Sequence, residues 1–133
     1  MTIYDFRMEI ISTDNAPKSP LYSQAVKAGG LIFVSGQAHF DPTTGKLVGE
    51  TIQEQTDQCF KNIAAILEAA GSSLSKVVST TFILVNESDF PGMSEVWAKW
   101  FPTNPPARQG AKHPISEATI PGYKVSISAI AEA

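Results

Sequence analysis

The residue best suited to chemistry in this chain is Arg108, which follows the segment Asn104-Pro105-Pro106-Ala107. The two proline rings restrict the backbone that leads into Arg108 and therefore set where its side chain points. A guanidinium carries a rigid fork of N–H donors that matches the two oxygens of a carboxylate. The segment predicts a carboxylate-binding arginine. The alternative is an arginine paired with an acidic neighbour or exposed to solvent, as most arginines are.

A second group of candidates, Tyr22, Ser23 and Gln24, follows a proline-rich segment. These residues are placed to line a cleft, although a loop tyrosine packs against the core about as often. The single cysteine, Cys59, falls on the apolar side of a helical pattern, which predicts a core thiol rather than a reactive one.

Metal and nucleotide chemistry have no motif in this sequence. His39 and His113 are far apart without ligand spacing, and one cysteine cannot build a thiolate cluster. The pair Gly29-Gly30 opens a predicted strand rather than a helix, so it does not form a phosphate-binding loop.

Length and composition indicate one folded domain spanning residues 1–133. Apolar residues make up 43% of the chain and charged residues 17%, which excludes intrinsic disorder. The low charge also suggests that sister subunits cover part of the surface. The net charge is −3 and the ten lysines and arginines are scattered, so nucleic acid is disfavoured as the main partner. The single cysteine, the absence of a secretory signal and the absence of a membrane-spanning run predict a cytoplasmic protein.

The elements that must position these residues can be predicted from periodicity. Helices are expected from Thr51 to Ala70, where Thr51 and Glu54 have the spacing of a capping box, and from Ser88 or Asp89 to Phe101. Six strands are expected at residues 7–12, 23–28, 31–37, 76–85, 107–111 and 123–131. The third of them is apolar at nearly every position, which predicts burial on both faces.

This order of elements predicts an α+β fold, a mixed sheet with two helices on one face. No helix remains for the other face of the sheet. The simplest expectation is an oligomer built on that face.

Several segments of the chain resemble the reactive intermediate deaminase family (RidA/YjgF). They include Leu21-Tyr-Ser-Gln-Ala-Val, Val34-Ser-Gly-Gln, Asp41-Pro-Thr-Thr-Gly, Asn62 to Leu74, Asp89-Phe90, Pro106-Ala-Arg and Ala129-Ile-Ala. These landmarks occur in the family's order and cover roughly Pro17 to Ala131.

The resemblance implies a chorismate-mutase-like barrel assembled as a homotrimer, with sites between subunits. It implies hydrolysis of enamines and imines, such as 2-aminoacrylate or 2-iminobutanoate, to 2-keto acids and ammonia without a metal or organic cofactor. Arg108 matches the family's carboxylate-binding arginine. Tyr22, Ser35 and Gly36 match cleft positions, and Gln37 flanks them.

The sequence departs from the family in its last strand and in the segment before it. Ser126 and Ser128 replace two glutamates, the first of which is thought to hold the attacking water. Because a general acid or base contributes about 10²- to 10⁴-fold, this loss puts catalysis in doubt while carboxylate binding stays intact. Ser126 is the candidate to hold the water instead.

The stretch from Gly110 to Tyr123 is longer than the family's loop and contains His113 and Glu117. One hypothesis is that one of these two side chains replaces the lost carboxylate. The alternative is an exposed loop.

Three functions follow from these observations. The first is an enamine or imine deaminase that uses Arg108. The second is a divergent relative that binds or hydrolyses another carboxylate-bearing metabolite, which the missing glutamate favours. The third, an endoribonuclease or translation inhibitor, is disfavoured by the acidic charge balance.

Overall fold

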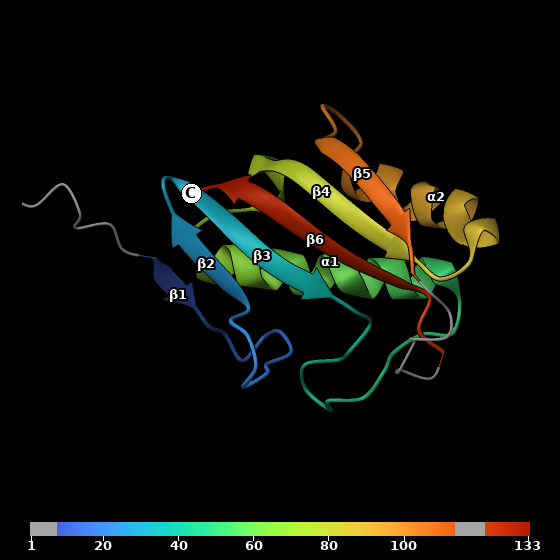
Figure 1. Ribbon diagram of the computed structural model, residues 1–133, viewed down its shortest axis with the longest axis horizontal. Helices are drawn as coiled ribbons and strands as arrows, with labels where there is room; N and C mark the ends of the chain where they lie inside the picture. Colours follow the sequence, from blue (N-terminus) through green and yellow to red (C-terminus); the bar gives the residue numbers. More distant parts are fainter. Residues whose placement is uncertain (1–7, 114–121) are drawn as a thin grey trace, which may run out of the picture.

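The computed structural model describes residues 8–113 and 122–133, which form one six-stranded sheet with two α-helices on one side (Figure 1). The strand order is β1-β2-β3-β6-β4-β5, and only β4 and β5 pair in parallel. The strands are β1 (Glu9–Ile11), β2 (Ala25–Ala28), β3 (Leu31–Gln37), β4 (Val77–Leu84), β5 (Ala107–Lys112) and β6 (Val125–Glu132). The predicted α+β class and two-helix layer are confirmed.

Helix α1 (Ile52–Ala69) begins and ends where its sequence signals predict. The Thr51 side chain accepts a hydrogen bond from the Glu54 backbone, and the Glu54 carboxylate accepts one from the Thr51 backbone. At the other end the chain turns through Gly71 at φ 79°, a conformation that costs glycine little. The backbone N–H of Ser72 then donates to the Leu67 carbonyl, which closes the helix.

Helix α2 (Phe90–Trp100) begins differently from the prediction. A short 3₁₀ turn (Glu87–Asp89) precedes it, and the Asn86 side chain caps that turn by accepting from the Ser88 backbone. Asp89 occupies the N-cap position of α2 without a side-chain cap. Of the two residues at which the sequence predicted the helix to start, Asp89 is therefore the N-cap residue. Its side chain forms no capping hydrogen bond, because the chain enters α2 from the 3₁₀ turn rather than from extended backbone.

An aromatic cluster joins the two helices to the sheet. The Phe60 ring on α1 meets the Trp97 ring of α2 edge-on, with the ring centres 5.0 Å apart. Trp97 in turn meets Phe82 of β4 edge-on at 5.9 Å. A second 3₁₀ turn, Leu74–Lys76, leads from α1 into β4. The cluster fixes α2 against β4 and, through β4, the edge strand β5.

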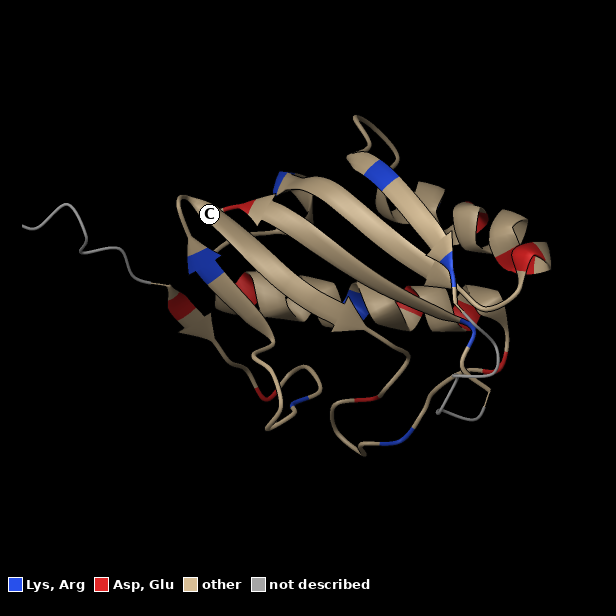
Figure 2. Cartoon of the chain, viewed as in Figure 1, with Lys and Arg blue, Asp and Glu red and all other residues tan. Residues whose placement is uncertain are grey.

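The central strands β3, β6 and β4 carry almost no charged residues, as the colouring of Figure 2 shows, so the sheet face opposite the helices is largely uncharged. In β6, Val125, Ile127 and Ala129 are buried against the helices, whereas the serines between them face the other way. Strand β3 alternates in the same manner, and Phe33 keeps 41% of its surface exposed. The prediction that β3 is buried on both faces was wrong for the single chain. Strand β3 is apolar at nearly every position because its side chains on the open face of the sheet are apolar as well as those that face the helices.

Within the described residues, no helix is long and apolar enough to span a bilayer.

His39 is a buried residue of the segment that links β3 to α1. Its side chain is 1% exposed, and its Nδ1 atom has no hydrogen-bond partner among the described residues. Burial therefore lowers the pKa of His39 below its ordinary value of 6.5, because the charged imidazolium is disfavoured there.

This burial predicts a pH-dependent stability. The unfolded chain binds a proton at His39 more readily than the folded chain, so the free energy of unfolding falls as the pH drops below about 6.5. Urea unfolding of the wild type and of His39→Gln at pH 7.5, 6 and 5 measures the effect. We expect a smaller decline in the variant.

The matched control is Gln109→Ala, which changes an exposed side chain that carries no titratable group and should decline as the wild type does. Equal declines in all three proteins would contradict the prediction.

Candidate functional site

Arg108 lies on the edge strand β5, on the face that the helices cover. In the parallel pairing of β4 with β5, Arg108 is in register with the buried Thr80, and Gly110 is in register with Phe82. Residues in register point to the same face of a sheet. The Arg108 side chain therefore points toward α2 and not toward the open face.

Three aromatic rings surround the Arg108 guanidinium. Its central carbon lies 5.4, 5.2 and 5.0 Å from the ring centres of Phe82, Phe90 and Trp97. A cation over an aromatic face gains about 0.5–1 kcal/mol at exposed sites, so the rings restrain the guanidinium. We call these three side chains the aromatic cage.

The cage leaves most N–H donors of Arg108 available. Its one side-chain hydrogen bond in the described part of the chain is a long one, 3.4 Å, from Nη1 to the Ser94 hydroxyl. No ion pair among the described residues involves Arg108. Of the two predicted alternatives, pairing with an acidic neighbour therefore finds no support in residues 8–113 and 122–133. Exposure to solvent is what the single chain shows, because Arg108 is an exposed residue of β5.

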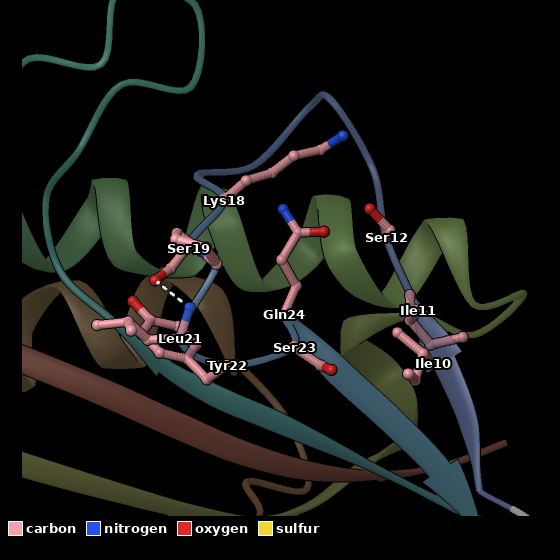
Figure 3. A pocket seen from close by; sticks show the side chains of 10 residues that line it. Ile10, Ile11, Ser12, Lys18, Ser19, Leu21, Tyr22, Ser23 and Gln24 are labelled. Atoms are coloured by element: carbon pink, nitrogen blue, oxygen red, sulfur yellow. Dashed lines mark hydrogen bonds between the residues drawn. The ribbon is translucent and has the colours of Figure 1, made fainter.

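Tyr22 lies near the other edge of the sheet, in the segment that enters β2. This segment and the end of β1 border a hollow of about 420 Å³ (Figure 3). Tyr22 and its neighbour Leu21 are 57% and 88% exposed. Two large exposed side chains next to a hollow form a surface suited to contact with another molecule.

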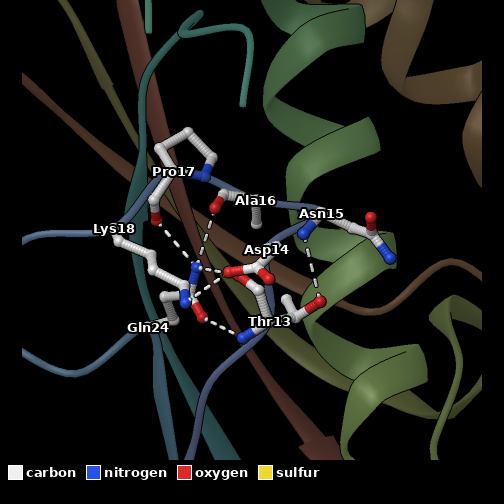
Figure 4. A network of polar contacts seen from close by, with 7 residues as sticks. All are labelled: Thr13, Asp14, Asn15, Ala16, Pro17, Lys18 and Gln24. Atoms are coloured by element: carbon white, nitrogen blue, oxygen red, sulfur yellow. Dashed lines mark hydrogen bonds and ion pairs between the residues drawn. The ribbon is translucent and has the colours of Figure 1, made fainter. Parts of the chain in front are cut away.

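Gln24 holds this segment in place from beneath (Figure 4). Its Nε2 atom donates to the carbonyls of Thr13, Ala16 and Pro17 at 2.9–3.0 Å, and its Oε1 atom accepts from the Thr13 backbone at 2.7 Å. Gln24 is 4% exposed, so these bonds form away from water. Besides bordering the hollow, as the sequence predicted, Gln24 therefore holds the backbone of the preceding segment in position.

Ser35 and Gly36 occupy an irregularity in the pairing of β3 with β6, between Val34 and Gln37. The Ser35 hydroxyl donates to the Ser23 carbonyl at 2.6 Å, and its backbone N–H donates to the Gln24 carbonyl at 2.9 Å. Ser35 therefore fastens β3 to the Tyr22 segment. Gly36 is exposed beside it, and a Cβ atom added there would meet nothing within 4 Å.

Ser126 lies near the start of β6, on the open face, and its hydroxyl is close enough to Tyr123 to affect the pKa of that phenol. The His113 ring meets the Tyr123 ring edge-on at 5.6 Å. Tyr123 thus joins two residues that the sequence singled out separately, and burial raises the pKa of its phenol. The sequence did not indicate Tyr123 as a site residue, because its two neighbours, His113 after β5 and Ser126 in β6, come close to it only in the folded chain.

The segment between β5 and β6 is shorter than the sequence predicted. Gly110 to Lys112 belong to β5, so the connection begins at His113 and not at Gly110. Glu117 lies outside the described residues.

The candidate residues fall into two halves that one chain does not bring together. Tyr22, Ser35 and Gly36 lie on or beside β2 and β3, and Ser126 lies on the neighbouring strand β6. Arg108 lies beyond β4, on the opposite face of the sheet. A site that uses both halves needs two copies of the chain.

No group of three or more metal-binding side chains occurs within the described ranges.

The chain is similar to proteins of one family along most of its length. The family described as Endoribonuclease L-PSP matches residues 13–133. A RutC family protein of Pyrococcus horikoshii is 50% identical over 102 residues, which are 75% of this chain and 80% of that protein. The 2-iminobutanoate/2-iminopropanoate deaminase of Rattus norvegicus is 40% identical over 125 residues, which are 92% of this chain and 88% of that protein. The chain belongs to the RidA/YjgF family.

Solved structures support the same assignment. RidA from the Antarctic bacterium Psychrobacter sp. superposes with a TM-score of 0.84 at 40% identity, over 94% of this chain and 99% of that one. The resemblance inferred from the sequence motifs is confirmed.

The role of Gln24 in positioning the segment around Tyr22 can be tested by substitution. Replacing it by leucine leaves three carbonyls and one N–H without partners in a buried place, and each such group costs about 1–3 kcal/mol. We expect Gln24→Leu to lower the free energy of unfolding by at least about 2 kcal/mol. Urea unfolding measures this, and limited proteolysis should show faster cleavage between Thr13 and Tyr22.

The control is Gln109→Leu, which replaces an exposed glutamine. A Gln24→Leu protein as stable as this control would contradict the positioning role.

Proposed function

We propose that this chain is an enzyme that hydrolyses 2-imino acids, and the enamines that tautomerise to them, to 2-keto acids and ammonia. Arg108 holds the substrate carboxylate. The observation that carries the proposal is the aromatic cage, which restrains a guanidinium without neutralising it. The name of the rat relative, 40% identical over 92% of this chain, supports the reaction class.

The reaction requires little beyond positioning and one water. With its carboxylate on the Arg108 fork, the substrate presents the carbon of its C=N bond to a water molecule. The water oxygen bonds to that carbon while the nitrogen gains a proton. The hydroxyl proton of this adduct then passes to the nitrogen as the C–N bond breaks, which releases ammonia and leaves the C=O group of the 2-keto acid. Fixing the carboxylate and the water in one geometry is a large part of such catalysis.

The residues that handle the water are found in the other half. Ser126 and Tyr123 supply two neighbouring hydroxyls that can hold a water by accepting from it and donating to it. Their hydroxyls are weaker bases than the glutamate that the family carries at position 126. A slower chemical step than in relatives with that glutamate is expected.

The site forms between two copies of the chain. Arg108 of one copy faces Tyr22, Gly36 and Ser126 of the next. In a closed ring of three copies, every site then contains residues from both subunits. The uncharged open face of the sheet supports this homotrimer, because its apolar surface is suited to a subunit interface (Figure 2).

RNA cleavage is the weaker candidate despite the description of the matching family. In the described ranges the lysines and arginines are spread over the chain and form no long stripe, although Arg108 and Lys112 share strand β5 (Figure 2). A net charge of −3 also opposes binding to phosphates.

Substitution of Arg108 tests the proposal. Freshly generated 2-iminobutanoate is mixed with enzyme, and the imine that semicarbazide can still trap is followed over time. Because a charge-assisted hydrogen bond contributes about 1.5–3 kcal/mol, we expect Arg108→Ala to lower kcat/KM about 10- to 100-fold. Arg108→Lys keeps the charge without the fork and should fall between Arg108→Ala and the wild type.

The control is Lys46→Ala, which removes a distant surface charge and should match the wild type. Full activity in Arg108→Ala would refute the carboxylate role. No turnover by the wild type would refute the reaction and favour a carboxylate-binding relative, which small 2-keto acids would then identify.

A further inference from the structure

Beside the aromatic cage lies a hollow that the reaction itself does not use. It measures about 340 Å³ and lies between β4, β5 and the start of α2. Its lining is mainly apolar, with Glu87 and Lys112 as its charged members, and consists of Phe82, Leu84, Glu87, Phe90, Gly110, Ala111 and Lys112. We propose that this hollow receives the substrate side chain and selects 2-imino acids with branched or aromatic side chains. The inference rests on the proposed function.

The hollow is continuous with the place where the carboxylate binds. Phe82 and Phe90 contribute to both, since each ring lines the hollow and also lies 5.2–5.4 Å from the Arg108 guanidinium carbon. Arg108, Gly110 and Lys112 share one face of β5, spaced two residues apart. A substrate held at Arg108 therefore reaches the hollow by extending along β5.

The far end of the hollow does not favour a second carboxylate. Lys112 is paired there with Glu87, with 3.3 Å between Nζ and Oε1. A second anionic group would have to compete with Glu87 for Lys112 and would be repelled by it. An uncharged side chain avoids this conflict and covers Leu84, Phe82 and Phe90.

Gly110 and Phe82 define the shape of the hollow together. A Cβ atom added at Gly110 would clash with the Phe82 ring. Phe82 can therefore lie flat over β5 only while residue 110 is glycine. Any side chain at this position pushes the ring aside and changes both the hollow and the cage.

The size of the hollow favours larger substrates. A volume of about 340 Å³ lies within the usual range for small-molecule pockets, about 300–1,000 Å³, whereas the smallest imino acids carry one or two carbons as a side chain. Each methylene that moves from water into an apolar site gains about fourfold in binding. Side chains of four or more carbons should therefore gain at least about tenfold over an ethyl group.

The experiment compares imines of different size on the wild-type enzyme. An L-amino acid oxidase with catalase generates them from L-2-aminobutyrate, L-leucine and L-phenylalanine, and loss of semicarbazide-trappable imine gives kcat/KM. We expect the leucine or phenylalanine imine to be preferred at least about tenfold over 2-iminobutanoate.

Equal values, or a preference for 2-iminobutanoate, would overturn the inference and leave the proposed function standing. Failure to accelerate any of the three imines would refute the proposed function and the inference with it.

Two variants test whether the hollow is the cause of the preference for larger side chains. Gly110→Ala displaces the Phe82 ring, and Phe90→Trp narrows the hollow at a residue that is already 41% exposed. Each should lower the ratio of leucine-imine to 2-iminobutanoate activity at least about fivefold. This ratio cancels any shared loss of carboxylate binding, because both substrates use Arg108.

The control is Gln109→Ala on the same strand, in register with Thr81, whose side chain lies on the other face. It should keep the wild-type ratio. An unchanged ratio in both hollow variants, with folding verified by thermal unfolding, would overturn the inference.

Discussion

The packing of the Phe82 ring over Gly110 and against the Arg108 guanidinium is the contact on which the candidate site depends. It links a residue of β4 to two residues of the edge strand β5, and the ring also meets Trp97 of α2. Edge strands are exposed on one side and are held less firmly than central ones. The aromatic cluster beneath β5 supplies the support that its free edge lacks, so that Arg108 is both restrained and accessible.

The sheet imposes the second constraint. Side chains alternate between its faces, and both helices cover the same face, so Arg108 and Ser126 point to opposite sides of one layer. No rotation of a side chain removes this separation. The assembly that we propose, in which one copy brings its β5 edge to the Tyr22 segment of another, would remove this separation and cover the apolar open face. It would also cover the exposed side chains of Leu21 and Tyr22.

Local signals in the sequence predicted the elements well. The limits of α1 follow from Thr51, Glu54 and Gly71, which act within a few residues of themselves. The alternation of β6 is equally local. Strand β3 was misjudged because its apolar residues serve two faces, and only one of them is covered within the chain.

Long-range contacts account for what the sequence did not predict. Phe82 lies on β4, and Phe90 and Trp97 lie on α2. No residue close to Arg108 in the sequence predicts that these three rings contact its guanidinium. The fit of Gly110 under Phe82 depends on the register of β4 with β5, which the sequence does not reveal. Tyr123 joins His113 to Ser126 only after the sheet has formed.

Mixing two defective variants tests the shared site most directly. Arg108→Ala disables one half, and Gly36→Val blocks the other at a position where the chain itself leaves room for a side chain. Each protein is purified, shown to keep the wild-type oligomeric state, and assayed alone. The two are then unfolded, combined in equal amounts and refolded together.

If the halves come from neighbouring copies, random mixing leaves about a quarter of the sites with both halves intact, and activity returns to about that fraction of the wild type. Activity no higher than the average of the two variants would contradict a site shared between subunits.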